Sequence, residues 1–105
     1  MARLFSTVLI AGVLDILAQQ SRYTVSGVVR DTRRQPVRDA RVEVLAPGFE
    51  GRFVLTDRDG RYRITDLSGG VQLQASKEGY STSVRAVATR TDAVVDFLLQ
   101  PLGDQ

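Results

Sequence analysis

Two acidic residues, Asp57 and Asp59, followed by Gly60, come closest in this sequence to a metal site. Hard cations such as calcium prefer clustered carboxylate oxygens. The same residues are typical of a tight turn, because aspartate side chains bond to turn backbone and glycine tolerates a positive φ. An EF-hand loop would need a glutamate six residues after the glycine and helices on both sides, whereas position 66 is Asp66. We therefore expect a structural turn, with Asp57 and Asp59 as weak calcium candidates and with no cofactor.

The aromatic residues are the second group that could bind a ligand, since an exposed ring can stack on a sugar. Phe49 lies between Pro47-Gly48 and Glu50-Gly51, which places it in a loop, and Tyr80 follows Gly79 at the start of a strand. We take Phe49 and Tyr80 as the candidate ligand-binding residues. The alternative for Phe49 is a ring folded back onto the domain, and for Tyr80 a ring that caps the core.

Composition argues against catalysis and against nucleic-acid binding. The 105 residues include no Cys, His or Trp, which removes thiolate nucleophiles, imidazole bases and the usual zinc ligands. The net charge of +2 arises from 14 basic and 12 acidic residues that are interspersed along the chain. Its densest basic group, from Arg30 to Arg38, is diluted by Asp31 and Asp39 and contains no aromatic residue on which a base could stack. We expect no enzyme activity and no nucleic-acid partner.

The first residues match a secretory signal peptide. Arg3 precedes an apolar stretch from Leu4 to Leu14, and Ala18 is the expected cleavage point. The run is shorter than the about 20 apolar residues of a membrane span, although a retained helix and an anchor remain alternatives. We assign residues 1–18 to the signal, 19–21 to a linker, 22–101 to the domain and 102–105 to a tail. The mature chain is then secreted, periplasmic or at the cell surface, without a membrane span.

Alternating apolar and polar residues predict the elements that position these side chains. Phe53 and Leu55 alternate with Val54 and Thr56 before the turn that contains Asp57, and a second alternating run follows it, which predicts a β-hairpin. Gly27, on the inward side of the first strand, indicates a bulge or the close approach of another element. Seven strands at about ten-residue spacing predict an antiparallel sandwich. They cover about residues 22–30, 40–45, 53–56, 61–65, 71–76, 80–88 and 95–99.

Several segments, in this order and spacing, resemble the carboxypeptidase regulatory-like domains of the transthyretin-like (prealbumin-like) group. They are Val25–Asp31, Gln35–Val37, Ala40–Val44, Thr56–Ile64, Gly70–Leu73 and Lys77–Tyr80. The resemblance implies a seven-stranded Greek-key β-sandwich. It also implies a non-catalytic accessory module of an exported or surface protein.

These observations lead to two hypotheses of function. The first is a monomeric exported module with a structural or protein-interaction role, which binds an unknown protein partner through its loops or an exposed sheet edge. The alternative is a carbohydrate-binding module that contacts a cell-surface polysaccharide through the loop around Phe49.

Overall fold

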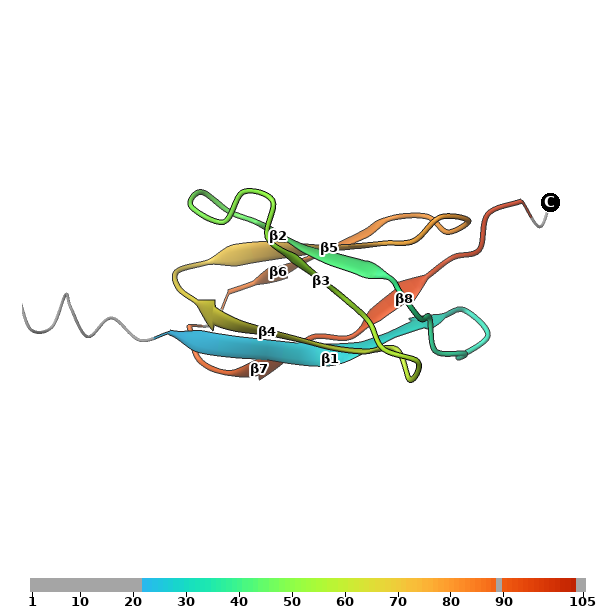
Figure 1. Cartoon of the computed structure of the whole chain (residues 1–105), viewed down its shortest axis with the longest axis horizontal. Coiled ribbons are helices and arrows are strands. Elements are labelled where there is room, and N and C mark those ends of the chain that lie inside the picture. The colour runs from blue at the N-terminus through green and yellow to red at the C-terminus, as the bar shows by residue number, and fades with distance from the viewer. Residues whose placement is uncertain (1–21, 89, 104–105) are drawn as a thin grey trace, which may run out of the picture.

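The structure is a computed structural model that describes residues 22–88 and 90–103 of the chain. The expected signal segment and the expected linker lie outside the described residues, as do residues 104–105 of the tail. The described residues form no helix and eight strands, arranged in two layers that pack face to face (Figure 1). The strands are β1 (Tyr23–Asp31), β2 (Arg41–Leu45), β3 (Phe53–Leu55), β4 (Arg61–Leu67), β5 (Val71–Ser76), β6 (Ser83–Val87), β7 (Ala93–Val94) and β8 (Phe97–Leu99). The expected all-β sandwich is confirmed.

Each layer is a four-stranded sheet. In the first, here called the β1 sheet, β1 pairs with β4 on one side and with both β7 and β8 on the other. In the second, the β2 sheet, the order is β3-β2-β5-β6 and every pairing is antiparallel. The inward faces of the two sheets meet in one core, because period-2 alternation along each strand places its apolar residues on one side.

The end of the chain differs from the expected seven-stranded antiparallel arrangement. The expected last strand over 95–99 consists of two short strands, β7 and β8, and both run parallel to β1. Between them, the Val95 carbonyl oxygen turns toward β1, where a Cβ on Gly27 would lie only 1.9 Å away. The Asp96 carboxylate accepts a hydrogen bond from the Val28 backbone nitrogen at 2.9 Å and thereby substitutes for a backbone acceptor. The expected close approach at Gly27 is confirmed. It interrupts the expected last strand, between β7 and β8.

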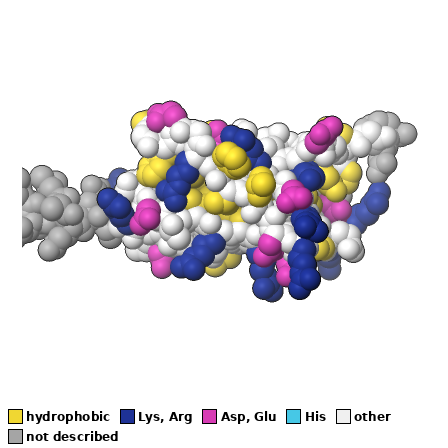
Figure 2. All heavy atoms as spheres, viewed as in Figure 1, with side chains coloured by type: hydrophobic (Ala, Val, Ile, Leu, Met, Phe, Trp, Pro, Cys, Tyr) yellow, Lys and Arg dark blue, Asp and Glu magenta, His cyan; other side chains and the backbone are white. Residues whose placement is uncertain are grey.

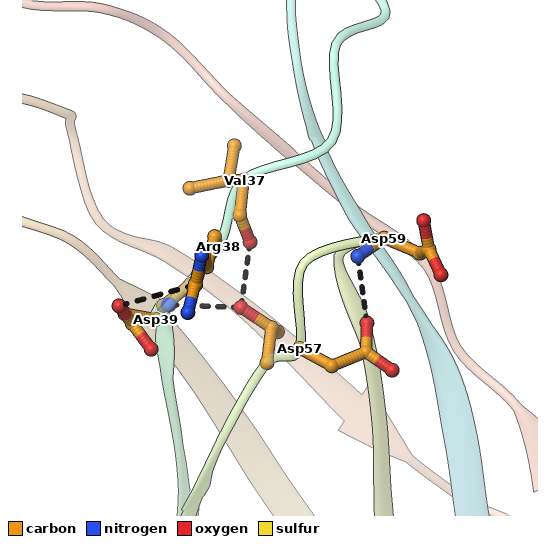
Figure 3. A network of polar contacts seen from close by, with 7 residues as sticks. Val37, Arg38, Asp39, Asp57 and Asp59 are labelled. Carbon is orange, nitrogen blue, oxygen red and sulfur yellow. Dashed lines mark hydrogen bonds and ion pairs between the residues drawn. The ribbon is translucent and has the colours of Figure 1, made fainter.

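The expected β-hairpin over residues 53–65 is wrong, although its turn is present. β3 pairs with β2 and β4 pairs with β1, so the turn carries the chain from one sheet to the other. The reason lies in Thr56, which is buried beside the loop that precedes β2. Its hydroxyl accepts a hydrogen bond from the Ala40 nitrogen at 2.8 Å and donates one to the Val37 carbonyl at 2.6 Å (Figure 3). These bonds hold the end of β3 against β2.

The core contains sixteen buried apolar residues from both sheets. The β1 sheet contributes Val25, Val29 and Ile64 among others, and the β2 sheet contributes Val42 and Leu73. Among the described residues, no buried side-chain nitrogen or oxygen lacks a hydrogen-bond partner. A core of this kind supplies the rigidity that fixes the positions of the surface residues.

Candidate interaction surfaces

The turn with Asp57, Asp59 and Gly60 is built by its own hydrogen bonds. One oxygen of the Asp57 carboxylate accepts from the backbone nitrogen of Asp59 at 2.9 Å (Figure 3). The same oxygen accepts from the backbone nitrogen of Arg61, also at 2.9 Å. Gly60 adopts a φ of 77° and donates its nitrogen to the Asp57 carbonyl at 2.9 Å. The bond from the Arg61 nitrogen lowers the pKa of the exposed Asp57 carboxyl.

This geometry gives Asp57 a turn-capping role. Within residues 22–88 and 90–103, no three acidic, histidine or cysteine side chains are grouped closely enough to hold a metal ion. One of the two carboxylate oxygens of Asp57 is engaged by two backbone amides. Calcium binding at Asp57 and Asp59 stays a prediction without support from the geometry of the turn.

Phe49 lies in the loop between β2 and β3 and is partly buried against the core. Two turn bonds shape this loop, from the Phe49 nitrogen to the Ala46 carbonyl and from the Arg52 nitrogen to the Phe49 carbonyl. The Arg52 guanidinium carbon lies 6.0 Å from the centre of the Phe49 ring. A sugar that stacked on this ring would have to share it with the core and with Arg52.

Tyr80 also packs partly buried against the core, at a bridge with Pro101. The structure does not bring it near Phe49. Phe49 follows the Leu45 end of β2, whereas Tyr80 follows the Ser76 end of β5. Because β2 and β5 are antiparallel, these two strand ends lie at opposite ends of the β2 sheet. The two candidate ligand residues therefore do not form one site.

Exposed apolar side chains that sequence analysis missed lie on the outer face of the β2 sheet, with polar and charged residues of β2 and β5 between them. Leu45, Phe53, Leu55 and Val84 are between 37% and 54% exposed. The Arg41 guanidinium carbon lies 3.8 Å from the centre of the Phe53 ring and covers part of it. Figure 2 shows hydrophobic side chains grouped in the middle of the visible face, around β3, with charged side chains beside them. Such a surface is typical of a contact with another macromolecule.

The open edges of the two sheets are the second feature suited to binding, because an edge strand carries backbone groups without partners. The β4 edge is largely covered. Asp57 donates its nitrogen to the Arg61 carbonyl at 3.0 Å and receives the Arg61 nitrogen on its carboxylate. Further along, the Arg52 guanidinium donates to the Thr65 carbonyl. These contacts leave little of β4 for an incoming strand.

Two other edges are short or covered. β3 has three residues, and the β7/β8 edge is broken at Val95 and Asp96. Near β8, the Ser81 nitrogen donates to the Gln100 carbonyl at 2.8 Å. Short, interrupted edges are common devices against unwanted strand pairing.

The β6 edge is the most open of the described edges. The Val44 nitrogen donates to the Arg52 carbonyl at 2.9 Å, so the backbone groups of Val44 point toward β3. Because alternate residues of a strand bond to opposite neighbours, the residues on either side of Val44 bond to β5. Carried through the register of β2, β5 and β6, this alternation points the N–H and C=O groups of Val84 and Ala86 away from the sheet. No hydrogen bond from the rest of the described chain reaches them.

The charged residue of β6 does not cover this edge. Arg85 reaches across to the other sheet, where its Nη1 donates to the Asp96 carbonyl at 3.2 Å. The sequence carried one signal of the open edge, since residues 83–87 contain neither proline nor lysine. The side on which the edge opens depends on the register, which alternation alone does not reveal.

The eight-stranded sandwich, its short loops and its open edge define a small β-sandwich module. The sequence profile of the carboxypeptidase regulatory-like domain matches residues 24–100, which is most of the chain. The chain therefore belongs to the carboxypeptidase regulatory-like domain family. No curated protein sequence matches it significantly.

Solved structures with similar folds come from diverse proteins. The TIE protein of Bacillus anthracis has a TM-score of 0.61 and 19% identity, over 77% of this chain and 17% of that one. Catechol 1,2-dioxygenase of Acinetobacter radioresistens has a TM-score of 0.66 and 15% identity, over 85% and 55%. A streptococcal ancillary pilin has a TM-score of 0.55 and 14% identity, over 80% and 34%.

These likenesses show the fold alone, since one sandwich can host unrelated activities. The chain spans 17% to 61% of the lengths of the matched structures, so it corresponds to part of each. Between residues 22 and 103, leaving out residue 89, no helix is long and apolar enough to cross a membrane.

Proposed function

We propose that this chain is a non-catalytic accessory module of an exported or cell-surface protein, and that it binds an extended segment of a protein partner at the β6 edge. Membership of the regulatory-like domain family supports the accessory role. The absence of His and Cys from the sequence leaves few groups for acid, base or nucleophilic chemistry. The two tyrosines with raised pKa, Tyr23 and Tyr62, donate their hydroxyls to the carbonyls of Gly69 and Val95. Those hydroxyls serve the fold.

The observation that carries the proposal is the open row of backbone groups on Val84 and Ala86. Only an extended polypeptide presents a donor and an acceptor at every second residue, about 6.8 Å apart along its length, as the edge of a sheet does. Val84 also exposes its side chain on the outer face of the β2 sheet, where its cross-strand neighbour is Gln74 of β5. A partner strand would therefore gain backbone bonds along the edge and an apolar contact with the Val84 side chain.

A proline substitution tests this pairing with little effect on the fold. Val84→Pro removes an N–H that points away from β5, so the intrinsic ladder is retained while the ring blocks an added strand. Leu55→Pro is the matched control, because the nitrogen of Leu55 points away from β2 in the same way at the β3 edge. Both variants should unfold near the wild-type temperature.

The probe is a peptide selected from a random display library on the immobilised wild-type domain. We expect selected peptides to have apolar residues at alternate positions, and Val84→Pro to weaken their binding at least about tenfold. Leu55→Pro should bind as the wild type does. Equal binding by Val84→Pro, or a library that yields no binder, would count against strand addition. Sugar binding through the Phe49 loop has less support, because its ring is partly buried and lies beside Arg52.

A further inference from the structure

A group of arginines lies on the outer face of the other sheet. Arg30 is on β1, and Arg61 and Arg63 are on β4, all three exposed and at positions that alternate with core residues. The register pairs Val28 with Arg61 and Ser26 with Arg63. Arg30 is thus diagonal to Arg61, at the about 7–8 Å typical of diagonal neighbours in a sheet. We name Arg30, Arg61 and Arg63 the basic face.

The guanidinium groups of the basic face make no ion pair or hydrogen bond with the described part of the chain. Two acidic residues beside them, Asp57 and Asp96, are engaged elsewhere. Asp57 attracts Arg61 through space, yet its carboxylate bonds to backbone nitrogens of the turn. Asp96 accepts the Val28 nitrogen. Positive charge therefore projects from this sheet with the carboxylates of Asp57 and Asp96 held against the backbone, while the turn residue Asp59 keeps an exposed carboxylate.

An open groove of about 380 Å³ lies on the same face. Its lining includes Ser26, Val28 and Arg30 of β1, Arg61 of β4, Val94 of β7, and Asp96 between β7 and β8. Guanidinium groups bind carboxylate and sulfate with paired hydrogen bonds, and the Ser26 hydroxyl can bond to a sugar hydroxyl. The groove thus offers guanidinium contacts for an anion on a mixed floor, with the Ser26 hydroxyl beside the apolar side chains of Val28 and Val94.

We propose that the basic face binds an acidic polysaccharide, whose carboxylate or sulfate groups contact Arg30, Arg61 and Arg63 while its sugar backbone lies along the groove. A nucleic acid is a poorer fit, because single-strand binding uses exposed aromatic rings for base stacking. The tyrosine beside the groove, Tyr62, is 5% exposed and its ring belongs to the core. This site is on the β1 sheet and is independent of strand addition at β6.

The test compares two triple variants with the same net charge. One changes the basic face, Arg30→Gln/Arg61→Gln/Arg63→Gln. The other, Arg22→Gln/Arg38→Gln/Arg90→Gln, removes three exposed arginines that lie outside it. Affinity electrophoresis and titration calorimetry would use polygalacturonate, dextran sulfate, neutral dextran and a single-stranded DNA oligonucleotide, at several salt concentrations. Urea unfolding of each variant shows whether it is folded.

We expect the wild type to bind a charged polysaccharide and not neutral dextran, with affinity that falls as salt rises. The basic-face variant should bind at least about tenfold more weakly and with a flatter salt dependence, and the control variant within about twofold of the wild type. Equal weakening of both variants would show diffuse attraction and overturn the proposal. So would absence of binding at low salt, equal binding of neutral dextran, or tighter binding of DNA than of either polysaccharide.

Discussion

Replacing Gly27 by alanine tests how β1 and the β7/β8 segment fit together. The added Cβ would lie 1.9 Å from the Val95 carbonyl oxygen and 2.7 Å from its carbon, and both are backbone atoms. An ordinary contact begins at about 3.4 Å, so the segment must move by more than 1 Å. That movement threatens the bond from the Tyr62 hydroxyl to the Val95 carbonyl and the 2.8 Å bond from the Val95 nitrogen to Ser26.

The expected loss of stability follows from two costs. Overpacking costs about 1–3 kcal/mol. Leaving the Tyr62 hydroxyl without its acceptor costs about 1–3 kcal/mol more. Gly27→Ala should therefore lower the free energy of unfolding by about 2–6 kcal/mol, a large share of the about 5–15 kcal/mol typical of a domain.

Urea unfolding followed by circular dichroism measures this loss, and Gly70→Ala is the matched control. A Cβ at Gly70 meets no atom within 4 Å. Its substitution should leave stability within about 1 kcal/mol of the wild type, with any gain coming from a less flexible unfolded chain. A loss below about 1 kcal/mol for Gly27→Ala would refute the close approach of Val95.

Two further predictions concern Thr56 and Asp57, which lie between β3 and β4. Thr56→Val should cost about 2–4 kcal/mol in urea unfolding, because it leaves the Ala40 N–H and the Val37 carbonyl buried without their partner. Thr56→Ser retains the hydroxyl and should cost about 1 kcal/mol; equal losses would contradict this role. Because the pKa of Asp57 is lower in the folded protein, its ionised carboxylate stabilises the fold. This stabilisation is complete above the ordinary carboxyl pKa of about 4 and is lost as pH falls through the pKa of the folded state. Asp57→Asn should therefore flatten the fall of melting temperature in acid, and an unchanged slope would contradict the cap.

The strands could be predicted from sequence where one alternating set is clearly apolar. Tyr62 and Ile64 alternate with arginines and threonine, and the structure buries both. The run at β3 was ambiguous, because Phe53 and Leu55 alternate with Val54 and Thr56 and either set could face inward. The choice is made by the buried bonds of Thr56 to Ala40 and Val37, a contact between segments sixteen or more residues apart.

The main feature that could not be predicted from the sequence was the pairing between strands far apart in the chain. β7 and β8 join β1 in parallel across more than sixty residues of chain, and antiparallel pairing is the usual outcome for short strands with short turns. Gly27 was the one local signal. Its missing side chain indicated a close approach, but only the structure shows that Val95 is the neighbour.

The basic face shows why charge density along a sequence is a poor guide to charge density on a surface. Sequence analysis placed the densest basic group between Arg30 and Arg38 and found it diluted by acids. In the fold, Arg30 lies across from β4, where Arg61 and Arg63 alternate with core residues. Register thus brings together arginines that are about thirty residues apart, while Asp57 turns its carboxylate to the backbone.

The two proposed binding surfaces belong to different sheets, which has a consequence for how the module works. A packed core about 10 Å thick separates the faces of the β1 and β2 sheets, and such cores resist continuous deformation. Coupling between ligands requires two states that each ligand stabilises differently. A bound polysaccharide on the basic face and a strand on β6 each contact one sheet, with no shared residue among those that carry the proposals. We therefore expect the module to be able to hold a polysaccharide and a protein segment at the same time, with each set of variants affecting its own ligand alone.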